Sequence, residues 1–124
     1  MPSAPDRRFL PHLTTHQVAS LSQKERAVVV LPIASIEQHG PHLPLFTDSL
    51  IVQEVLGRAL TLLPDDFPVW VLPLLPYGKS NEHARYAGTI TLTSETLIRV
   101  LKEIGASVAR SGFHRLVILN GHGG

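Results

Sequence analysis

The chain has 124 residues, of which 44% are hydrophobic and 17% are charged, and its formal net charge is +1. This composition is too apolar for an intrinsically disordered chain, and its charge is too balanced for a nucleic-acid-binding surface. Because the chain has no cysteine, disulfides, thiolate nucleophiles and cysteine-ligated metals are excluded.

The N-terminal segment, Met1 to Arg8, is polar and interrupted by proline, and it lacks the apolar stretch of a secretory signal. No segment reaches the roughly 18 apolar residues that cross a bilayer. We therefore expect a cytoplasmic protein that has neither a membrane nor a nucleic acid as partner.

The first half of the chain predicts two helices around a strand. Thr14 and Gln17 have the spacing of a capping box, which predicts a short helix. Ala27 to Pro32 is a continuous apolar run, typical of a strand buried on both faces. A polar loop, Ser35 to Asp48, leads to a helix with Thr47 or Asp48 as its N-cap. Apolar residues expected on one face of this helix are Ile51, Val52, Val55, Leu56, Ala59 and Leu60.

The second half predicts two more main strands. Val69 to Leu75 is a buried-strand candidate, and Thr89 to Leu92 is a short extra strand. Ser94 is expected to cap a longer helix that ends before Gly112. Leu116 to Leu119 is the third buried strand. In the helix that begins at Ser94, the residues expected to face inward are Leu97, Leu101, Ile104 and Val108.

Strands that alternate with helices predict a mainly parallel sheet within a three-layer α/β domain. Sites in such sheets lie at the carboxyl ends of the strands, and here the segments after the strands are rich in His, Asp and Glu. The chain stops in a glycine-rich loop just after a buried strand. We therefore expect residues 1–124 to form a single domain that is the N-terminal part of a larger one.

The loop after the first strand carries candidate metal ligands. Glu37 and His39 are two positions apart, so in extended backbone both side chains point the same way, and Asp48 follows at the start of a helix. Two carboxylates and an imidazole suit Zn or Mn, and a shared carboxylate could hold two ions that activate a bridging water. The alternative is structural, with Asp48 as an ordinary N-cap and Glu37 as a solvated residue.

The other two loops add further candidates. His122 lies between glycines at the end of the third strand, where it is either a ligand or part of a turn that caps the sheet. Ser80 lacks the G-x-S-x-G context of a serine nucleophile, so we expect it to bind substrate instead. Glu82 and His83 are candidates for catalytic or supporting roles. Histidines expected to be ordinary surface or core residues are His12, His16 and His114.

Three segments together resemble the creatininase family of metal-dependent amidohydrolases. They are LPIASIEQHGPHLPLFTD (Leu31 to Asp48), YGKSNEHARYAGTITL (Tyr77 to Leu92) and NGHGG (Asn120 to Gly124), and they occur in the family's order. The resemblance implies an α/β/α sandwich, a homo-oligomer that is often a hexamer, and two divalent ions. These ions would be Zn or Mn, with Fe as a further alternative.

The resemblance also implies residue roles. Glu37 and His122 would bind one ion, His39 would bind the other, and Asp48 would bridge the two. A metal-bridging hydroxide would attack an amide or cyclic amide carbon, while the ions stabilise the oxyanion. Ser80 matches a serine that contacts substrate.

One position departs from the pattern of true creatininases. There, a glutamate two residues after the last-loop histidine binds the second ion, whereas this chain has Gly124. The sequence is thus similar to the GHGG branch, which includes formamide deformylases and mycofactocin-associated peptidases, and creatinine is not the expected substrate. A free carboxylate at Gly124 is an alternative source of the missing ligand.

We expect a metal-dependent amidohydrolase that cleaves a C–N bond of a small cyclic amide, a formamide or a peptide-like substrate. The alternative is a catalytically incomplete metal-binding fragment or assembly module of the same family. A nucleotide-binding domain is disfavoured because neither a G-x-G-x-x-G nor a Walker loop follows the first strand.

Overall fold

The computed structural model describes residues 6–124. Its helices and strands, in chain order, are α1 (Thr15–Ser20), β1 (Val28–Ile33), α2 (Thr47–Thr61), β2 (Val69–Val71), α3 (Ser94–Arg110) and β3 (Arg115–Asn120). Short 3-10 turns are η1 (Asp6–Arg8), η2 (Leu10–His12) and η3 (Asn81–His83). Within the described part of the chain, no helix is long and apolar enough to cross a membrane.

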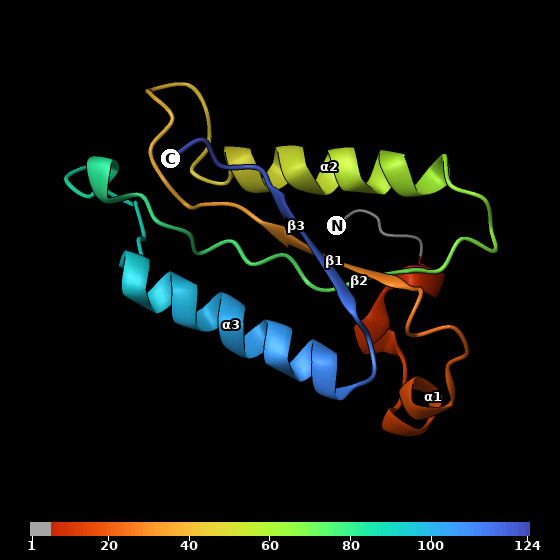
Figure 1. Cartoon of the computed structure of the whole chain (residues 1–124). Helices are drawn as coiled ribbons and strands as arrows, with labels where there is room; N and C mark the ends of the chain where they lie inside the picture. Colours follow the sequence, from red (N-terminus) through yellow and green to blue (C-terminus); the bar gives the residue numbers. More distant parts are fainter. Residues whose placement is uncertain (1–5) are drawn as a thin grey trace.

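The three strands form a parallel sheet in the order β2-β1-β3. Helix α2 covers one face of this sheet and α3 covers the other, which makes three layers (Figure 1). The expected α/β architecture is therefore confirmed. Helix α1 begins with the predicted capping box, in which the Thr14 hydroxyl accepts from the Gln17 backbone and the Gln17 side chain accepts from the Thr14 backbone.

The central strand β1 supplies side chains to two separate cores. Val30 packs with Leu56 and Leu60 of α2, whereas Val29 points the other way and packs with Val108 of α3 and with Phe113. Adjacent strand residues face opposite sides of a sheet, so a strand buried between two helix layers must be apolar at every position. This explains the uninterrupted apolar run that predicted β1.

Part of the predicted burial is wrong. On α2 the buried apolar residues are Val52, Leu56 and Leu60, whereas Ile51 and Val55 are each 54% exposed. The buried residues lie four positions apart and form one stripe along α2 that packs on the sheet, and the neighbouring apolar residues lie outside this stripe. Strand β3 is also not buried, because among the described residues it pairs with β1 alone and lies at the sheet edge, with Val117 46% exposed.

Several boundaries also differ from the prediction. The segment from Thr89 to Leu92 is not a strand, although Ile90 makes one antiparallel bridge to Ile36. Strand β2 ends at Val71 instead of Leu75, because Pro73 follows and cannot donate a ladder hydrogen bond. The N-caps lie one or more residues earlier than predicted, at Phe46 for α2 and Thr93 for α3. Helix α3 ends before Gly112 as predicted, and Gly112 has a positive φ of 97°.

Candidate metal centre

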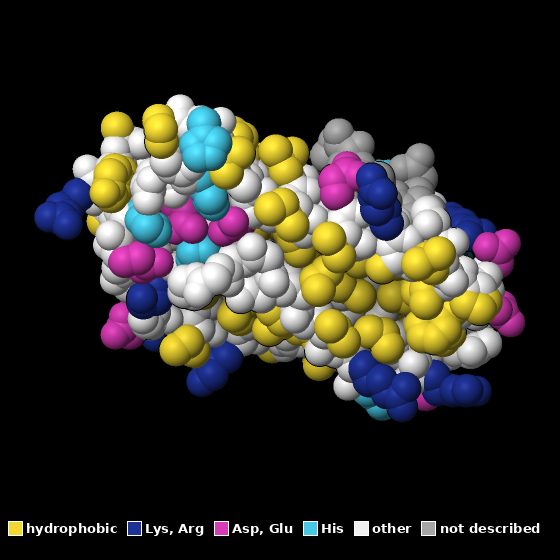
Figure 2. Space-filling view, turned by 90° about the horizontal axis from the view of Figure 1, so that it is seen from above, with side chains coloured by type: hydrophobic (Ala, Val, Ile, Leu, Met, Phe, Trp, Pro, Cys, Tyr) yellow, Lys and Arg dark blue, Asp and Glu magenta, His cyan; other side chains and the backbone are white. Residues whose placement is uncertain are grey.

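The sheet register brings three loops to one edge. Ile33 at the end of β1 is opposite Asn120 at the end of β3, and Ile33 also bridges to Leu75 in the segment after β2. The loops that follow these positions therefore start side by side. Figure 2 shows acidic and histidine side chains gathered at one end of the molecule, beside a largely apolar surface.

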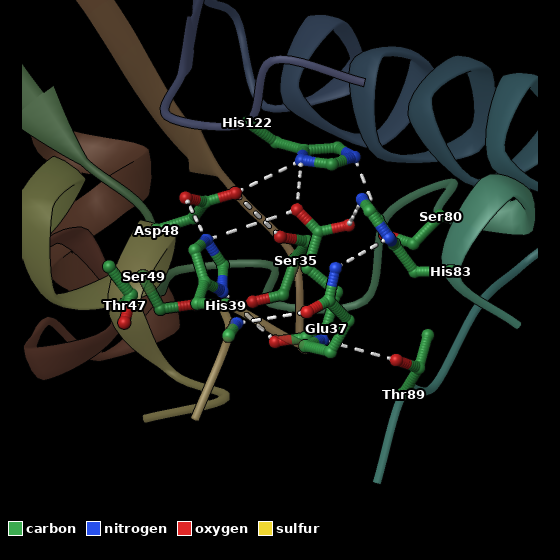
Figure 3. Close-up of polar contacts among 12 residues, drawn as sticks. Ser35, Glu37, His39, Thr47, Asp48, Ser49, Ser80, His83, Thr89 and His122 are labelled. Carbon is green, nitrogen blue, oxygen red and sulfur yellow. Dashed lines mark hydrogen bonds and ion pairs between the residues drawn. The ribbon is translucent and has the colours of Figure 1, made fainter. Parts of the chain in front are cut away.

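The four predicted ligands converge at this edge (Figure 3). Asp48 lies between the two histidines, with Oδ1 2.9 Å from His39 Nε2 and Oδ2 3.0 Å from His122 Nδ1. Glu37 Oε1 lies 3.1 Å from His122 Nδ1 and 4.0 Å from His39 Nε2. One carboxylate thus faces each histidine with a different oxygen, which is the geometry of a bridging group.

Each histidine is oriented by a backbone carbonyl. Nδ1 of His39 lies 3.0 Å from the Glu37 carbonyl oxygen, and Nε2 of His122 lies 2.9 Å from the Lys79 carbonyl oxygen. Because a carbonyl only accepts, these ring nitrogens carry protons and donate. In the neutral rings the other nitrogens, which face the carboxylates, therefore have lone pairs. Histidine ligands of metals show this arrangement, with one nitrogen donating to a carbonyl and the other binding the ion.

The buried carboxylate of Glu37 also indicates a cation at this site. Its side chain is 7% exposed, and its Oε2 has no hydrogen-bond partner among residues 6–124. A buried carboxylate oxygen without a partner is costly, so such a group indicates an ion or proton that the protein alone does not supply. Lone pairs and carboxylates that face one another across about 3 Å fit a divalent cation between them.

The electrostatics of the Asp48 carboxylate follow from its neighbours. Burial tends to raise the pKa of Asp48, but hydrogen bonds from Ser35, His39 and His122 outweigh it and lower the pKa. The charged carboxylate is therefore the favoured form, as metal binding requires.

The histidines shift the opposite way. Burial tends to lower the pKa of His39, but its hydrogen bonds to the Glu37 carbonyl and to Asp48 outweigh burial and raise the pKa. For His122, burial likewise opposes the carbonyl of Lys79 and the carboxylates of Asp48 and Glu37, and the pKa is again raised. The raised pKa values of His39 and His122 mean that their contacts with the carboxylates favour the protonated imidazole.

Asp48 is not the N-cap that the structural alternative assumed. It lies in the first turn of α2, one residue inside the helix from Thr47, and the cap position is Phe46, which makes no side-chain cap bond. Its oxygens contact Ser35 and the two histidines instead. The helix N-terminus, with its partial positive charge, stabilises a carboxylate at this position.

Sequence reasoning missed Ser35. Its fully buried hydroxyl donates to Asp48 Oδ2 at 2.7 Å, and its carbonyl accepts from the Ser49 hydroxyl at 3.1 Å. These bonds fix the Asp48 carboxylate next to the end of β1. The available signal was a small polar residue placed directly after an uninterrupted apolar strand.

The middle loop provides the three remaining predicted residues. Ser80 is fully buried, with Oγ 3.4 Å from His122 Nε2, and its backbone N–H donates to Thr91. Glu82 is exposed in η3, and His83 has Nε2 3.8 Å from Glu37 Oε2. The substrate-binding role of Ser80 stays a prediction.

Potential ligand atoms form two groups whose members lie within 4.8 Å of one another. One is Glu37, His39 and Asp48, and the other is Glu37, Glu82 and His122. Glu82 therefore brings a third carboxylate to the centre. The histidines exposed elsewhere are His12, His16, His42 and His114.

Gly124 lies against Glu82. A Cβ atom at residue 124 would contact Glu82 Oε1 and would come within 2.5 Å of His122 Nε2. A side chain at this position therefore requires both Glu82 and His122 to move. The space beside His122 thus holds the Glu82 carboxylate from η3, and the last loop, which has Gly124, provides no side-chain carboxylate there.

The sequence of this chain matches a known family over most of its length. The model of the creatininase family, described as creatinine amidohydrolase, matches residues 11–124. A mycofactocin precursor peptide peptidase from Mycobacterium tuberculosis is 44% identical over 118 residues, which cover 90% of this chain and 45% of that protein. Creatinine amidohydrolase from Pseudomonas putida is 31% identical over 92% of this chain and 44% of its own length. The chain thus spans less than half of these relatives.

Solved structures agree with the sequence matches. A structure named creatininase Mn has a TM-score of 0.79 and 31% identity, over 93% of this chain and 45% of its own. A mutant creatininase of the Zn-Zn type has a TM-score of 0.79 and 29% identity, over 98% of this chain and 46% of its own. The fold, the order of the loops and the match over residues 11–124 all lead to one conclusion: the chain belongs to the creatininase family.

Proposed function

We propose that this chain forms the metal centre of an amide hydrolase and holds two divalent ions with Glu37, His39, Asp48 and His122. The observation that carries the proposal is the orientation of the two histidines. In each histidine, one ring N–H donates a hydrogen bond to a backbone carbonyl, and the other ring nitrogen faces Asp48. Solved relatives named as Mn and Zn-Zn forms favour these two metals.

The chain's own residues have distinct tasks at this centre. Asp48 would hold both ions, Ser35 fixes the Asp48 carboxylate through a hydrogen bond, and Glu37 would supply a buried charge that balances the cations. Glu82 adds a carboxylate on the open side, next to His122. When bound, divalent ions supply Lewis acidity to a substrate carbonyl and lower the pKa of a bound water.

We propose that the substrate contains the amide bond of a peptide or of a formamide, and that such substrates are preferred to creatinine. The higher identity to a mycofactocin precursor peptide peptidase, 44% against 31% for creatinine amidohydrolase, supports this order. The crowding of residue 124 by Glu82 supports it as well, because true creatininases place a glutamate there. Small cyclic amides remain in the substrate panel.

The test is hydrolysis by the full chain after loading with Mn²⁺ or Zn²⁺. Short peptides, formamides, cyclic amides and creatinine are each incubated with it, and newly released amines are quantified. We expect metal-dependent release from at least one of the first three classes, abolished by chelator and by Asp48→Asn. Release that survives chelator and Asp48→Asn would contradict the proposal.

A second candidate is a metal-binding or assembly module without turnover. It needs only the convergence of the candidate ligands around Asp48, which involves no contact with a substrate. Retained metal with no hydrolysis of any substrate class would support this candidate and overturn the enzymatic one.

We also propose self-association through the exposed apolar residues of α2. Leu50 is 47% exposed and Ile51 and Val55 are each 54% exposed, so they form an apolar surface that a second copy could cover. Light scattering after size exclusion should show an oligomer, and Ile51→Lys with Val55→Lys should reduce its mass. A monomer at micromolar concentration would contradict this. The cytoplasmic location stays a prediction.

A further inference from the structure

His83 lies beside the metal centre without a task among the proposed ligands (Figure 3). Its ring is 30% exposed, and Nε2 points toward Glu37 Oε2 from 3.8 Å. That separation is too long for a hydrogen bond. The imidazole nitrogen and the unpartnered carboxylate oxygen therefore face each other across a short gap.

The other ring nitrogen of His83 is held by Gln38. Gln38 Nε2 lies 2.8 Å from His83 Nδ1, and Gln38 Oε1 accepts the backbone N–H of Gly40 at 2.9 Å. The contact with Gly40 determines the orientation of the Gln38 amide, because in the flipped amide the Gln38 N–H₂ group would face the Gly40 N–H, and both groups are donors. The backbone of Gln38 is fixed as well, by its N–H bond to Thr89 Oγ1 at 3.1 Å.

This orientation determines which nitrogen of His83 carries the proton. Gln38 presents an N–H₂ donor, so His83 Nδ1 must accept with its lone pair. In the neutral ring the single proton is then on Nε2, which points at Glu37 and the space next to it. The opposite tautomer would place the Nδ1 proton against the amide protons of Gln38.

We propose that Gln38 is a positioning residue that holds His83 as an Nε2–H donor facing the metal centre, where it hydrogen-bonds a polar atom of the bound substrate. The substrate part rests on the proposed amide hydrolase function, whereas the tautomer rests on the contacts of Gln38 alone. His83 acts here by donating a hydrogen bond and keeps its proton. It is therefore neither a metal ligand nor a base, because both roles need a lone pair on Nε2.

The tautomer is measured by NMR on the full chain, labelled with ¹⁵N and freed of metal, at a pH of about 8, where an ordinary histidine is neutral. Long-range ¹H–¹⁵N correlations distinguish protonated from unprotonated ring nitrogens, and His83→Gln identifies the signals of His83. We expect a protonated Nε2 and an unprotonated Nδ1. A proton on Nδ1 in the unsubstituted chain would overturn the proposal.

Gln38→Glu tests the positioning role. A carboxylate at this position still accepts the Gly40 N–H, but it can no longer donate to His83, so Nδ1 should gain a proton. Gln53→Glu is the matched control, since Gln53 is on α2 and makes no side-chain hydrogen bond among residues 6–124, and it should leave His83 unchanged. If Nδ1 stays unprotonated in Gln38→Glu, Gln38 does not set the tautomer.

Metal content separates this inference from the proposed function. His83→Gln should keep the full number of ions per chain, and loss of an ion would show that His83 is a ligand and would overturn the donor role. A chain that binds no metal but shows the expected tautomer would contradict the proposed function and leave the positioning by Gln38 intact. The two failures are therefore distinguishable.

Discussion

Ser35 shows how a residue outside the ligand set shapes the metal centre. Its hydroxyl is the donor to Asp48 Oδ2, at 2.7 Å, in a fully buried setting. Ser35→Ala should weaken metal binding by roughly 10–100-fold, because partners that orient a ligand have effects of that size. Titration with Mn²⁺ measures the change.

The control is Ser49→Ala, another buried serine nearby. Its hydroxyl donates to the Ser35 carbonyl and contacts no ligand side chain. We expect a loss of stability of about 0.5–1.5 kcal/mol and metal affinity close to that of the parent chain. Equal metal affinity in Ser35→Ala and Ser49→Ala would contradict the role assigned to Ser35.

In the proposed centre, both ions depend on Asp48. Asp48→Asn keeps the shape of the side chain but removes its charge, so we expect both ions to be lost at metal concentrations that saturate the parent chain. Asp65→Asn is the control, because Asp65 is exposed, pairs with Arg7 and belongs to neither candidate ligand group. Elemental analysis of the two variants compares them directly. Full metal content in Asp48→Asn would remove Asp48 from the ligand set.

The histidine pKa shifts predict how the metal-free chain responds to pH. The pKa values of His39 and His122 are raised by Asp48, Glu37 and backbone carbonyls, against the effect of burial. Their stabilising contribution is fully present below the ordinary histidine pKa of about 6.5 and is lost as the pH rises through the raised values. The lowered pKa of Asp48 contributes above its own ordinary value and is lost in acid.

Thermal unfolding with chelator present should therefore show Tm falling as the pH rises above about 6.5. His39→Gln should flatten this dependence. With metal added, the trend should reverse, because the ion binds deprotonated imidazole. A Tm of the metal-free chain that does not fall over this range would show that the histidine–carboxylate contacts do not stabilise the fold.

At the level of elements, Gly121 decides how closely the end of β3 approaches α2. A Cβ atom there would lie 2.7 Å from Val52 Cβ and 3.0 Å from the Asp48 carbonyl oxygen. Gly121→Ala should destabilise the chain by about 1–3 kcal/mol through overpacking and should weaken metal binding by moving His122. Gly123→Ala, where nothing lies within 4 Å, should do neither. Urea unfolding of both variants checks this, and equal stability would contradict it.

Elements were predictable where the local pattern decides the structure. The apolar run of β1 and the capping box of α1 depend on neighbouring residues, and both are found. The exposure of Ile51 and Val55 was not predictable, because an amphipathic pattern does not say how much of a helix face the sheet covers. Likewise, the edge position of β3 depends on the order β2-β1-β3, which no single segment encodes.

At the scale of the whole molecule, topology assembled the site. Glu37, His39 and His122 follow strand ends, and parallel strands bring these ends together, so their convergence could be predicted from the sequence. The Ser35 hydroxyl and the Lys79 carbonyl could not, because hydrogen bonds of about 3 Å depend on loop backbone that propensities do not fix. The same holds for the direction of the Gln38 amide.

Most of these predictions follow from the proposed dinuclear metal centre. The most direct test is elemental analysis of the chain purified without chelators and loaded with Mn²⁺ or Zn²⁺, with Asp65→Asn and Asp48→Asn measured beside it. We predict two ions per chain in the parent chain and in Asp65→Asn, and no ions in Asp48→Asn. A parent chain without bound metal, or with a metal content that Asp48→Asn leaves unchanged, would contradict the claim.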